Sequence, residues 1–139
     1  MKIFQQQLQL KTKRGFHLIT TDILNAIPNL NEIKTGICHV FIQHTSASLT
    51  INENADPLVR KDFENWFNKL IPDGDANFLH TSEGPEDMPA HLKSSLLDTS
   101  VMIPISNGKL TLGMWQGIYL CEHRNNINER NLIITAWGV

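Results

Sequence analysis

The order of strand-like and helix-like segments along the chain is the feature that most constrains its fold. Residues Lys2–Lys11 alternate polar and apolar side chains, as does a strand with one buried face. Strand patterns return over Ile37–His44, Thr99–Ile105 and Asn131–Trp137, with helical patterns between the first and the last. We therefore expect an α+β fold with an antiparallel or mixed sheet, a sandwich-like core and helices segregated to one side.

Turn signals divide the strand-like segments. Lys13-Arg14-Gly15 and Asn125–Asn128 predict turns, and Asn107-Gly108 predicts a hairpin. One long strand is expected over Lys109–Glu122. With these turns, the N-terminal segment forms a strand pair and the later strands follow one another as hairpins.

Three helices are expected between the strands. Thr20 or Thr21 caps the first, Asp56-Pro57 begins the second, and the third runs from about Glu86 to Leu97. Residues Asp73–Asp87 form a long loop rich in Gly, Asp and Ser, and long loops in compact domains tend to be functional or disordered.

Size and composition exclude several classes of protein. A chain of 139 residues, 41% hydrophobic and 19% charged, fits one globular domain spanning residues 1–139. The net charge of -2 and the lack of a Lys/Arg cluster argue against nucleic acid. We expect no signal peptide and no membrane span, because the N-terminus alternates and no apolar run approaches ~18 residues. Cys38 and Cys121 lie in strand-like runs, so a reducing cytoplasm is the expected location.

Strand alternation also selects polar side chains that continue apolar faces. His44 extends the apolar face of Ile37–His44, and Glu122 extends that of Lys109–Glu122, where Gln116 also lies. A lone histidine on such a face is more often structural than a ligand. A buried carboxylate must be paired, bound to a metal or left near the open end of its strand, because an unpaired buried charge is costly.

Two further histidines lie outside the strands. His80 is in the long loop, and His91 is near the start of the third helix. With His44 they would form a three-histidine site with an open position, the arrangement of catalytic zinc. The alternatives are a surface position for His80 and a packing role for His91. His123 falls on the face opposite Glu122 and is the weaker candidate.

Other catalytic patterns find no support. His44 is close to Ser46 and Ser48, but neighbouring strand side chains diverge and no Gly-x-Ser-x-Gly pattern occurs. Glycine-rich phosphate loops of the Walker or dinucleotide type are absent too.

Three blocks of residues resemble the YjbQ family, which is described as similar to secondary thiamine-phosphate synthases. The blocks are His44–Leu49 followed by Asn52-Glu53, then Met88–Leu96, then Gly113–Ile118, with Glu122 and Arg130 after them. The resemblance spans nearly the whole chain in the same order. It implies a small α+β fold, a homotrimer, and a cluster of polar residues that often binds a metal.

The resemblance also indicates site residues. It supports His44, His80 and His91 as ligands of a divalent metal, with zinc as the first choice and Mg²⁺ if the substrate carries pyrophosphate. Catalytic roles are expected for six residues: Ser46, Asn52, Asp56, Gln116, Glu122 and Arg130. The chain departs from the family at Glu86-Asp87, where Asn is common, and at Met114, where Thr is common.

Three functions follow as alternatives. The first is thiamine-phosphate synthase activity on small-molecule substrates, in which Arg130, Lys93 and a divalent ion stabilise the departing pyrophosphate. The second is a metal-dependent hydrolase or lyase in which Glu122 is the base. The third is a metal-binding or ligand-binding homotrimer without catalysis. Trp115 and Tyr119, on the face opposite Glu122, are the expected interface anchors of the trimer.

Overall fold

The structure, a computed structural model, describes residues 1–139 as one curled antiparallel sheet with three α-helices and a short 3-10 helix. The elements in chain order are β1 (Lys2–Leu18), α1 (Thr20–Ala26), η1 (Pro28–Glu32), β2 (Thr35–Ile42), β3 (Ala47–Glu53), α2 (Pro57–Leu70), α3 (Asp87–Leu96), β4 (Ser100–Ser106), β5 (Lys109–Leu110) and β6 (Gln116–Gly138). The α+β class is confirmed. The sandwich-like core is wrong, because there is no second sheet and the single sheet closes its core by curling.

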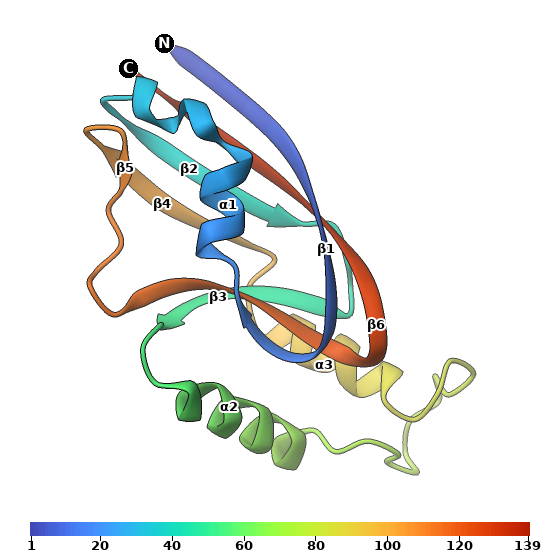
Figure 1. The fold of residues 1–139 in the computed structure, drawn as a ribbon. Coiled ribbons are helices and arrows are strands. Elements are labelled where there is room, and N and C mark those ends of the chain that lie inside the picture. The colour runs from blue at the N-terminus through green and yellow to red at the C-terminus, as the bar shows by residue number, and fades with distance from the viewer.

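Strand β6 is the centre of the sheet. The strand order is β1-β6-β2-β4-β5, and β3 also pairs with β6. Along one edge β6 pairs with β1; along the other it pairs first with β3 and then with β2, always antiparallel. In Figure 1 the long, curved β1 and β6 lie side by side and bring the two chain ends together.

Both faces of the first half of β6 are buried. Ile118 and Leu120 belong to the main core of 18 buried residues, which α1 covers through Ile23 and through Ile19 at its N-cap. The alternate residues point the other way and pack under α2. Two of them, Tyr119 and Cys121, form a second cluster with Phe16 of β1 against Phe63 and Phe67 of α2. The expected segregation of helices to one side is therefore wrong, because α1 and α2 cover opposite faces.

This packing corrects the role expected for Tyr119. Its ring is fully buried, and its hydroxyl bonds Glu53 and Arg60. Trp115, just before β6, is 61% exposed, as predicted. Only one of the two expected interface anchors is therefore on the surface.

Local signals explain where the helices begin. Asp56 caps α2 by accepting a hydrogen bond from the Leu58 N–H at 2.9 Å, and Pro57 follows at the first helical position, as predicted. The expected cap of α1 is wrong, because Ile19 occupies that position and the Thr20 hydroxyl accepts from Ile118 N–H instead.

The turn predictions have mixed outcomes. Asn107 and Gly108 form the predicted hairpin with positive φ angles of 48° and 77°. The expected strand Lys109–Glu122 is wrong, because residues 111–115 leave the sheet between β5 and β6.

The turns expected at Lys13–Gly15 and Asn125–Asn128 are also wrong. Strands β1 and β6 continue through both segments, and the register shifts between Lys13 and Gly15. Residues 123–126 of β6 form a bulge opposite Arg14, where Gly15 and Asn126 have positive φ.

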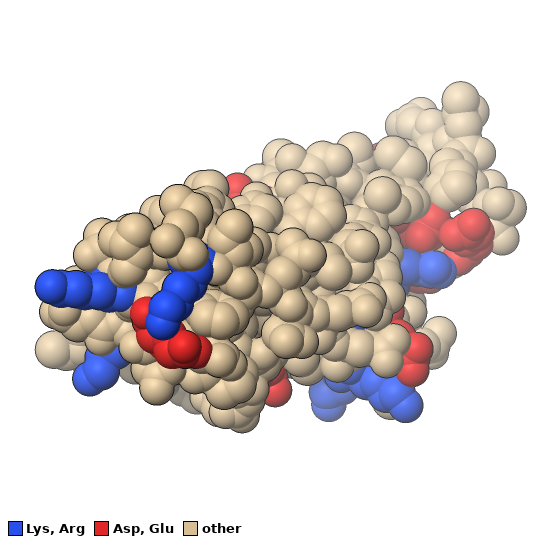
Figure 2. Space-filling view, turned by 90° about the horizontal axis from the view of Figure 1, so that it is seen from above, with Lys and Arg blue, Asp and Glu red and all other residues tan.

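The surface of the fold has two further features. Seen from above, it is mostly uncharged, with charged side chains near its margins (Figure 2). No helix has both the length and the apolar character needed to cross a membrane.

Candidate functional site

Two histidines and one carboxylate meet where the long loop joins α3. His80 lies in that loop, and Asp87 and His91 lie one turn apart on α3, so they share a helix face. Asp87 Oδ2 is 2.7 Å from His80 Nε2 and 3.1 Å from His91 Nε2. One ligand atom from each residue lies within 4.8 Å of the others. These residues form a candidate metal centre.

The carboxylate of Asp87 is kept ionised. Its side chain is 2% exposed, and burial alone would raise the pKa of Asp87. The hydrogen bond from His80 and the charges of His91 and Arg124 outweigh burial, so the pKa lies below its usual value. Arg124 Nε lies 3.2 Å from Asp87 Oδ1 as an ion pair, although its N–H points too far away to make a hydrogen bond.

The orientation of His91 leaves its second nitrogen facing Asp87. His91 Nδ1 donates to the Thr45 carbonyl at 2.9 Å, so Nε2 carries a lone pair in the neutral ring and a second proton in the charged ring that lowers the pKa of Asp87. That lone pair faces Asp87 Oδ2, another electron-pair donor, at 3.1 Å. Two such atoms at this distance require a proton or a cation between them.

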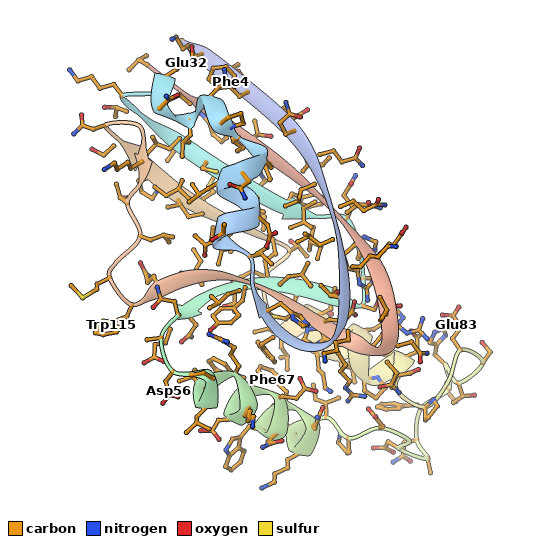
Figure 3. All side chains as sticks on the ribbon, viewed as in Figure 1. Phe4, Glu32, Asp56, Phe67, Glu83 and Trp115 are labelled. Atoms are coloured by element: carbon orange, nitrogen blue, oxygen red, sulfur yellow. The ribbon has the colours of Figure 1, made fainter.

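A cavity opens beside His80. It has a volume of about 350 Å³ and is lined by loop residues that include Phe78, Thr81 and Gly84. Arg124 holds this loop through a 3.0 Å bond to the Glu83 carbonyl. In Figure 3 Glu83 marks the loop, which projects from the end of the molecule opposite Trp115. The candidate metal centre is therefore accessible to a small molecule.

A second polar cluster is buried under the curled sheet. Arg130 binds both carboxylate oxygens of Glu122, at 2.7 Å from Nε to Oε1 and through a short contact from Nη2 to Oε2. The Thr12 hydroxyl donates to the same carboxylate at 2.9 Å. Arg130 Nη2 also donates to Ser46 Oγ at 3.1 Å. The buried Glu122 carboxylate is therefore paired, which is one of the outcomes expected from the sequence. The cluster contains three of the predicted catalytic residues, Ser46, Glu122 and Arg130.

His44 does not belong to the cluster of His80, Asp87 and His91. Its Nε2 accepts a hydrogen bond from the Asn131 N–H at 2.8 Å, so this nitrogen is occupied. Burial and the nearby charge of Arg130 lower the pKa of His44, which keeps the ring neutral. The structure brings His80 and His91 together as predicted, but Asp87 lies with them where His44 was expected.

The remaining three predicted residues lie at the far end of β3. Asn52 Oδ1 accepts from Glu53 N–H, Gln116 Oε1 accepts from Gly113 N–H, and Asp56 caps α2. Strand β3 runs from Ala47, opposite Glu122, to Glu53, opposite Gln116. At 3.3 Å per residue the two ends are roughly 20 Å apart. In Figure 3 Asp56 and Trp115 lie on the same side of the view, opposite Glu83.

Sequence reasoning missed Asp87 and Arg124. A signal for Asp87 was present, since an acidic residue four positions before His91 shares its helix face. No such signal marks Arg124, which reaches the loop from the bulge of β6. His123 is buried on the face opposite Glu122, where its Nε2 is 2.8 Å from Ser48 Oγ.

Comparison with known proteins identifies the family. The family described as UPF0047 protein YjbQ-like matches residues 5–139. The UPF0047 protein YjbQ of Escherichia coli O157:H7 is 47% identical over 136 residues, covering 97% of this chain and 98% of that protein. The chain belongs to the YjbQ (UPF0047) family.

Solved structures of YjbQ relatives share the fold. A YjbQ/UPF0047 protein of Clostridium acetobutylicum superposes with a TM-score of 0.84 at 37% identity, covering 94% of this chain and 98% of that chain. A YbjQ-like protein of unknown function from Sulfolobus solfataricus gives a TM-score of 0.86 at 24% identity, covering 99% of each chain.

The three blocks that carry the YjbQ resemblance fall into different places in the structure. His44–Leu49 leads into β3, Met88–Leu96 is most of α3, and Gly113–Ile118 begins β6. The first two blocks meet where the Thr45 carbonyl receives the hydrogen bond of His91. The third lies at the other end of β3.

Proposed function

We propose that this YjbQ protein binds one divalent metal ion through His80, Asp87 and His91 and is a metal-dependent hydrolase or lyase acting on a small molecule. The observation that carries the proposal is Asp87 Oδ2, which faces His80 Nε2 at 2.7 Å and His91 Nε2 at 3.1 Å. Two imidazole nitrogens and a carboxylate oxygen fit catalytic zinc and also suit ferrous iron. The ionised state of Asp87 fits a cation as well.

The donor set determines what a bound ion would contribute. A divalent ion held by His80, Asp87 and His91 beside the cavity would supply Lewis-acid chemistry toward a carbonyl or phosphoryl group. Other residues of the chain orient these ligands and shape the cavity. The Thr45 carbonyl fixes the ring of His91, Arg124 attracts the second oxygen of Asp87, and Phe78 gives the cavity an apolar wall.

We assign Glu122 and Arg130 to positioning. Arg130 donates to the Ser46 carbonyl at 3.3 Å and to the Ser46 hydroxyl, and Ser46 follows the residue whose carbonyl holds His91. Glu122 in turn fixes the guanidinium of Arg130. Because the Glu122 side chain is fully buried, a role in orienting a metal ligand suits it better than contact with substrate.

The thiamine-phosphate synthase reaction has weaker support. Arg130 and Lys93, the cations expected on the departing pyrophosphate, are 5% and 1% exposed. Both are engaged, Arg130 with Glu122 and Lys93 with Asn68 Oδ1 at 2.7 Å. A pyrophosphate group would need cations that face the solvent.

A homotrimer is the assembly we propose, in line with the family resemblance. Large apolar side chains stand exposed at several places, among them Met114 and Trp115 before β6 and Trp66 and Leu70 on α2. Such side chains are typical interface anchors. Light scattering at micromolar concentration should give three times the chain mass of 15.8 kDa, and a monomeric mass would refute the assembly.

Metal content tests the proposal directly. The purified protein is stripped with a chelator and titrated with Zn²⁺, alongside Asp87→Asn, His91→Ala and a control, His39→Ala, on β2 outside the cluster. We expect stoichiometric binding in the wild type and the control, and an affinity at least about tenfold lower in the other two variants. Unchanged zinc binding by His91→Ala would refute the metal centre.

The third donor needs its own test. If Asp87 is the third ligand, the variant His44→Ala should still bind the metal. Loss of the metal in this variant would show that His44 is a ligand. Turnover of the loaded protein on phosphoesters, on carboxylic esters and on the two thiamine precursors then separates the reactions. Transfer between the two thiamine precursors alone would overturn the hydrolase or lyase assignment.

A further inference from the structure

A second cavity is lined by residues of β1 and β6 beside the bulge. It has a volume of about 370 Å³ and is lined by Lys11, Thr12, Lys13, His17 and Ile127. None of these residues lines the cavity beside His80. Its size falls within the usual range of small-molecule sites.

The bulge at Gly15 shapes this cavity. Lys11 and Lys13 are alternate residues of β1, so both side chains point to the same face roughly 7 Å apart at their Cα atoms. Gly15 has a φ of 134°, which few other residues adopt. Past it, the ring of His17 folds back and donates from Nε2 to the Lys13 carbonyl at 2.6 Å. The two ammonium groups and the imidazole therefore surround one opening.

Lys11 and Lys13 give the opening a positive charge, and nearby carboxylates neutralise it only weakly. Lys13 makes no ion pair. Lys11 lies 3.9 Å from Glu129, but both side chains are more than half exposed, so the pair contributes little. The buried Glu122 carboxylate behind Thr12 is neutralised by Arg130.

We propose that this cavity binds the phosphate group of a small organic phosphomonoester. Two lysine side chains on flexible stems can close on one dianion, and the ring of His17 lines the same opening. Ile127, directly opposite Lys13, is 72% exposed and offers an apolar wall to the organic part of the ester. Inorganic phosphate would leave that wall uncovered, so the ester is the better ligand.

Calorimetric titration of the full-length protein tests the assignment, with inorganic phosphate and phenyl phosphate as probes and sodium chloride at equal ionic strength as the blank. Phenyl phosphate should bind more tightly than inorganic phosphate, and Ile127→Ser should remove most of that difference. The double variant Lys11→Gln/Lys13→Gln should raise both dissociation constants at least about tenfold. The matched control Lys34→Gln/Lys109→Gln makes the same change in net charge outside the cavity and should bind as the wild type does.

The outcomes separate this site from the metal centre. Binding should persist in chelator-treated protein and in His91→Ala, because the two cavities share no residue. No saturable heat above the salt blank, or unchanged binding by the Lys11/Lys13 double variant, would overturn the site. Equal affinity for the two probes would overturn the assignment of an ester.

Discussion

Acid should destabilise this fold through His123, a buried neutral histidine. The side chain is 2% exposed, its Nε2 lies 2.8 Å from Ser48 Oγ, and its ring packs edge-on against Phe16. Burial, followed by the positive charges of Lys93, Arg130 and Arg14, lowers the pKa of His123 to about 3. In the unfolded chain the imidazole has its ordinary pKa near 6.5.

The sign and size of the effect follow from these two pKa values. Between pH 6.5 and about 3 the unfolded state binds the proton and the folded state does not, so stability falls as the pH falls. Each pH unit in this window costs about 1.4 kcal/mol of unfolding free energy. From pH 7.5 to pH 4 the loss assigned to His123 is about 3 kcal/mol.

The comparison that isolates this loss uses a variant that cannot titrate. Urea unfolding of the wild type, His123→Gln and the control His39→Gln is followed by tryptophan fluorescence at pH 7.5, 6, 5 and 4, at one protein concentration. The carboxylates and the histidines that no variant replaces contribute equally to all three curves, so only the difference between curves counts. His123→Gln should lose about 3 kcal/mol less than the wild type, and His39→Gln should follow the wild type. Parallel curves for all three proteins would refute the buried neutral state of His123.

Three further changes test the local architecture. Gly15→Ala should lower the unfolding free energy by about 1–2 kcal/mol because φ is positive there, and an unchanged urea midpoint would contradict this. Asp56→Ala should cost about 1 kcal/mol by removing the cap of α2 while leaving zinc stoichiometry unchanged; lost zinc would give Asp56 a role in the site. Glu122→Gln should cost about 3–5 kcal/mol because Arg130 stays buried without its counter-charge. In thermal unfolding the double variant Glu122→Gln/Arg130→Met should be more stable than Glu122→Gln alone, and equal destabilisation would refute the pairing.

Local signals predicted the elements whose structure depends on neighbours in sequence. The Asp56-Pro57 start of α2, the Asn107-Gly108 hairpin and the approximate span of α3 needed only capping, turn chemistry and helical spacing. Strand β3 was not predicted. Its apolar residues Ala47, Leu49 and Ile51 do alternate with polar residues, but the pairing with β6 that holds the strand is made with a distant segment of the chain.

Long-range packing produced the errors. The segments Lys13–Gly15 and Asn125–Asn128 have turn-like composition, but each is held in a strand by the other across the β1–β6 pair. Tyr119 was expected on the surface because strand parity implies one buried face. In the structure, helix α2 packs on the face of β6 that carries Tyr119. The sequence of β6 alone gives no sign of this packing.

The types of residue and their spacing predicted some members of the candidate site, but they did not predict how these residues come together. Strand alternation selected Glu122, and loop composition drew attention to His80. The third member of that centre, Asp87, looked like a departure from the family pattern, because Asn is common beside this position. Its importance depends on the loop folding back so that His80 reaches the first turn of α3.

The bulge in β6 joins the two polar clusters of the molecule. Glu122 and Arg130 are separated by eight positions in one strand, which in a regular strand would place them roughly 26 Å apart. They touch because residues 123–126 leave the ladder opposite Arg14, which bends the strand and brings its two halves together over Thr12. The same bulge carries Arg124 outward to Asp87 and the long loop. This single bulge, which the positive φ angles of Gly15 and Asn126 permit, therefore has two effects. It places Arg124 beside Asp87 of the candidate metal centre. It also brings together Glu122 and Arg130, and Arg130 in turn holds Ser46.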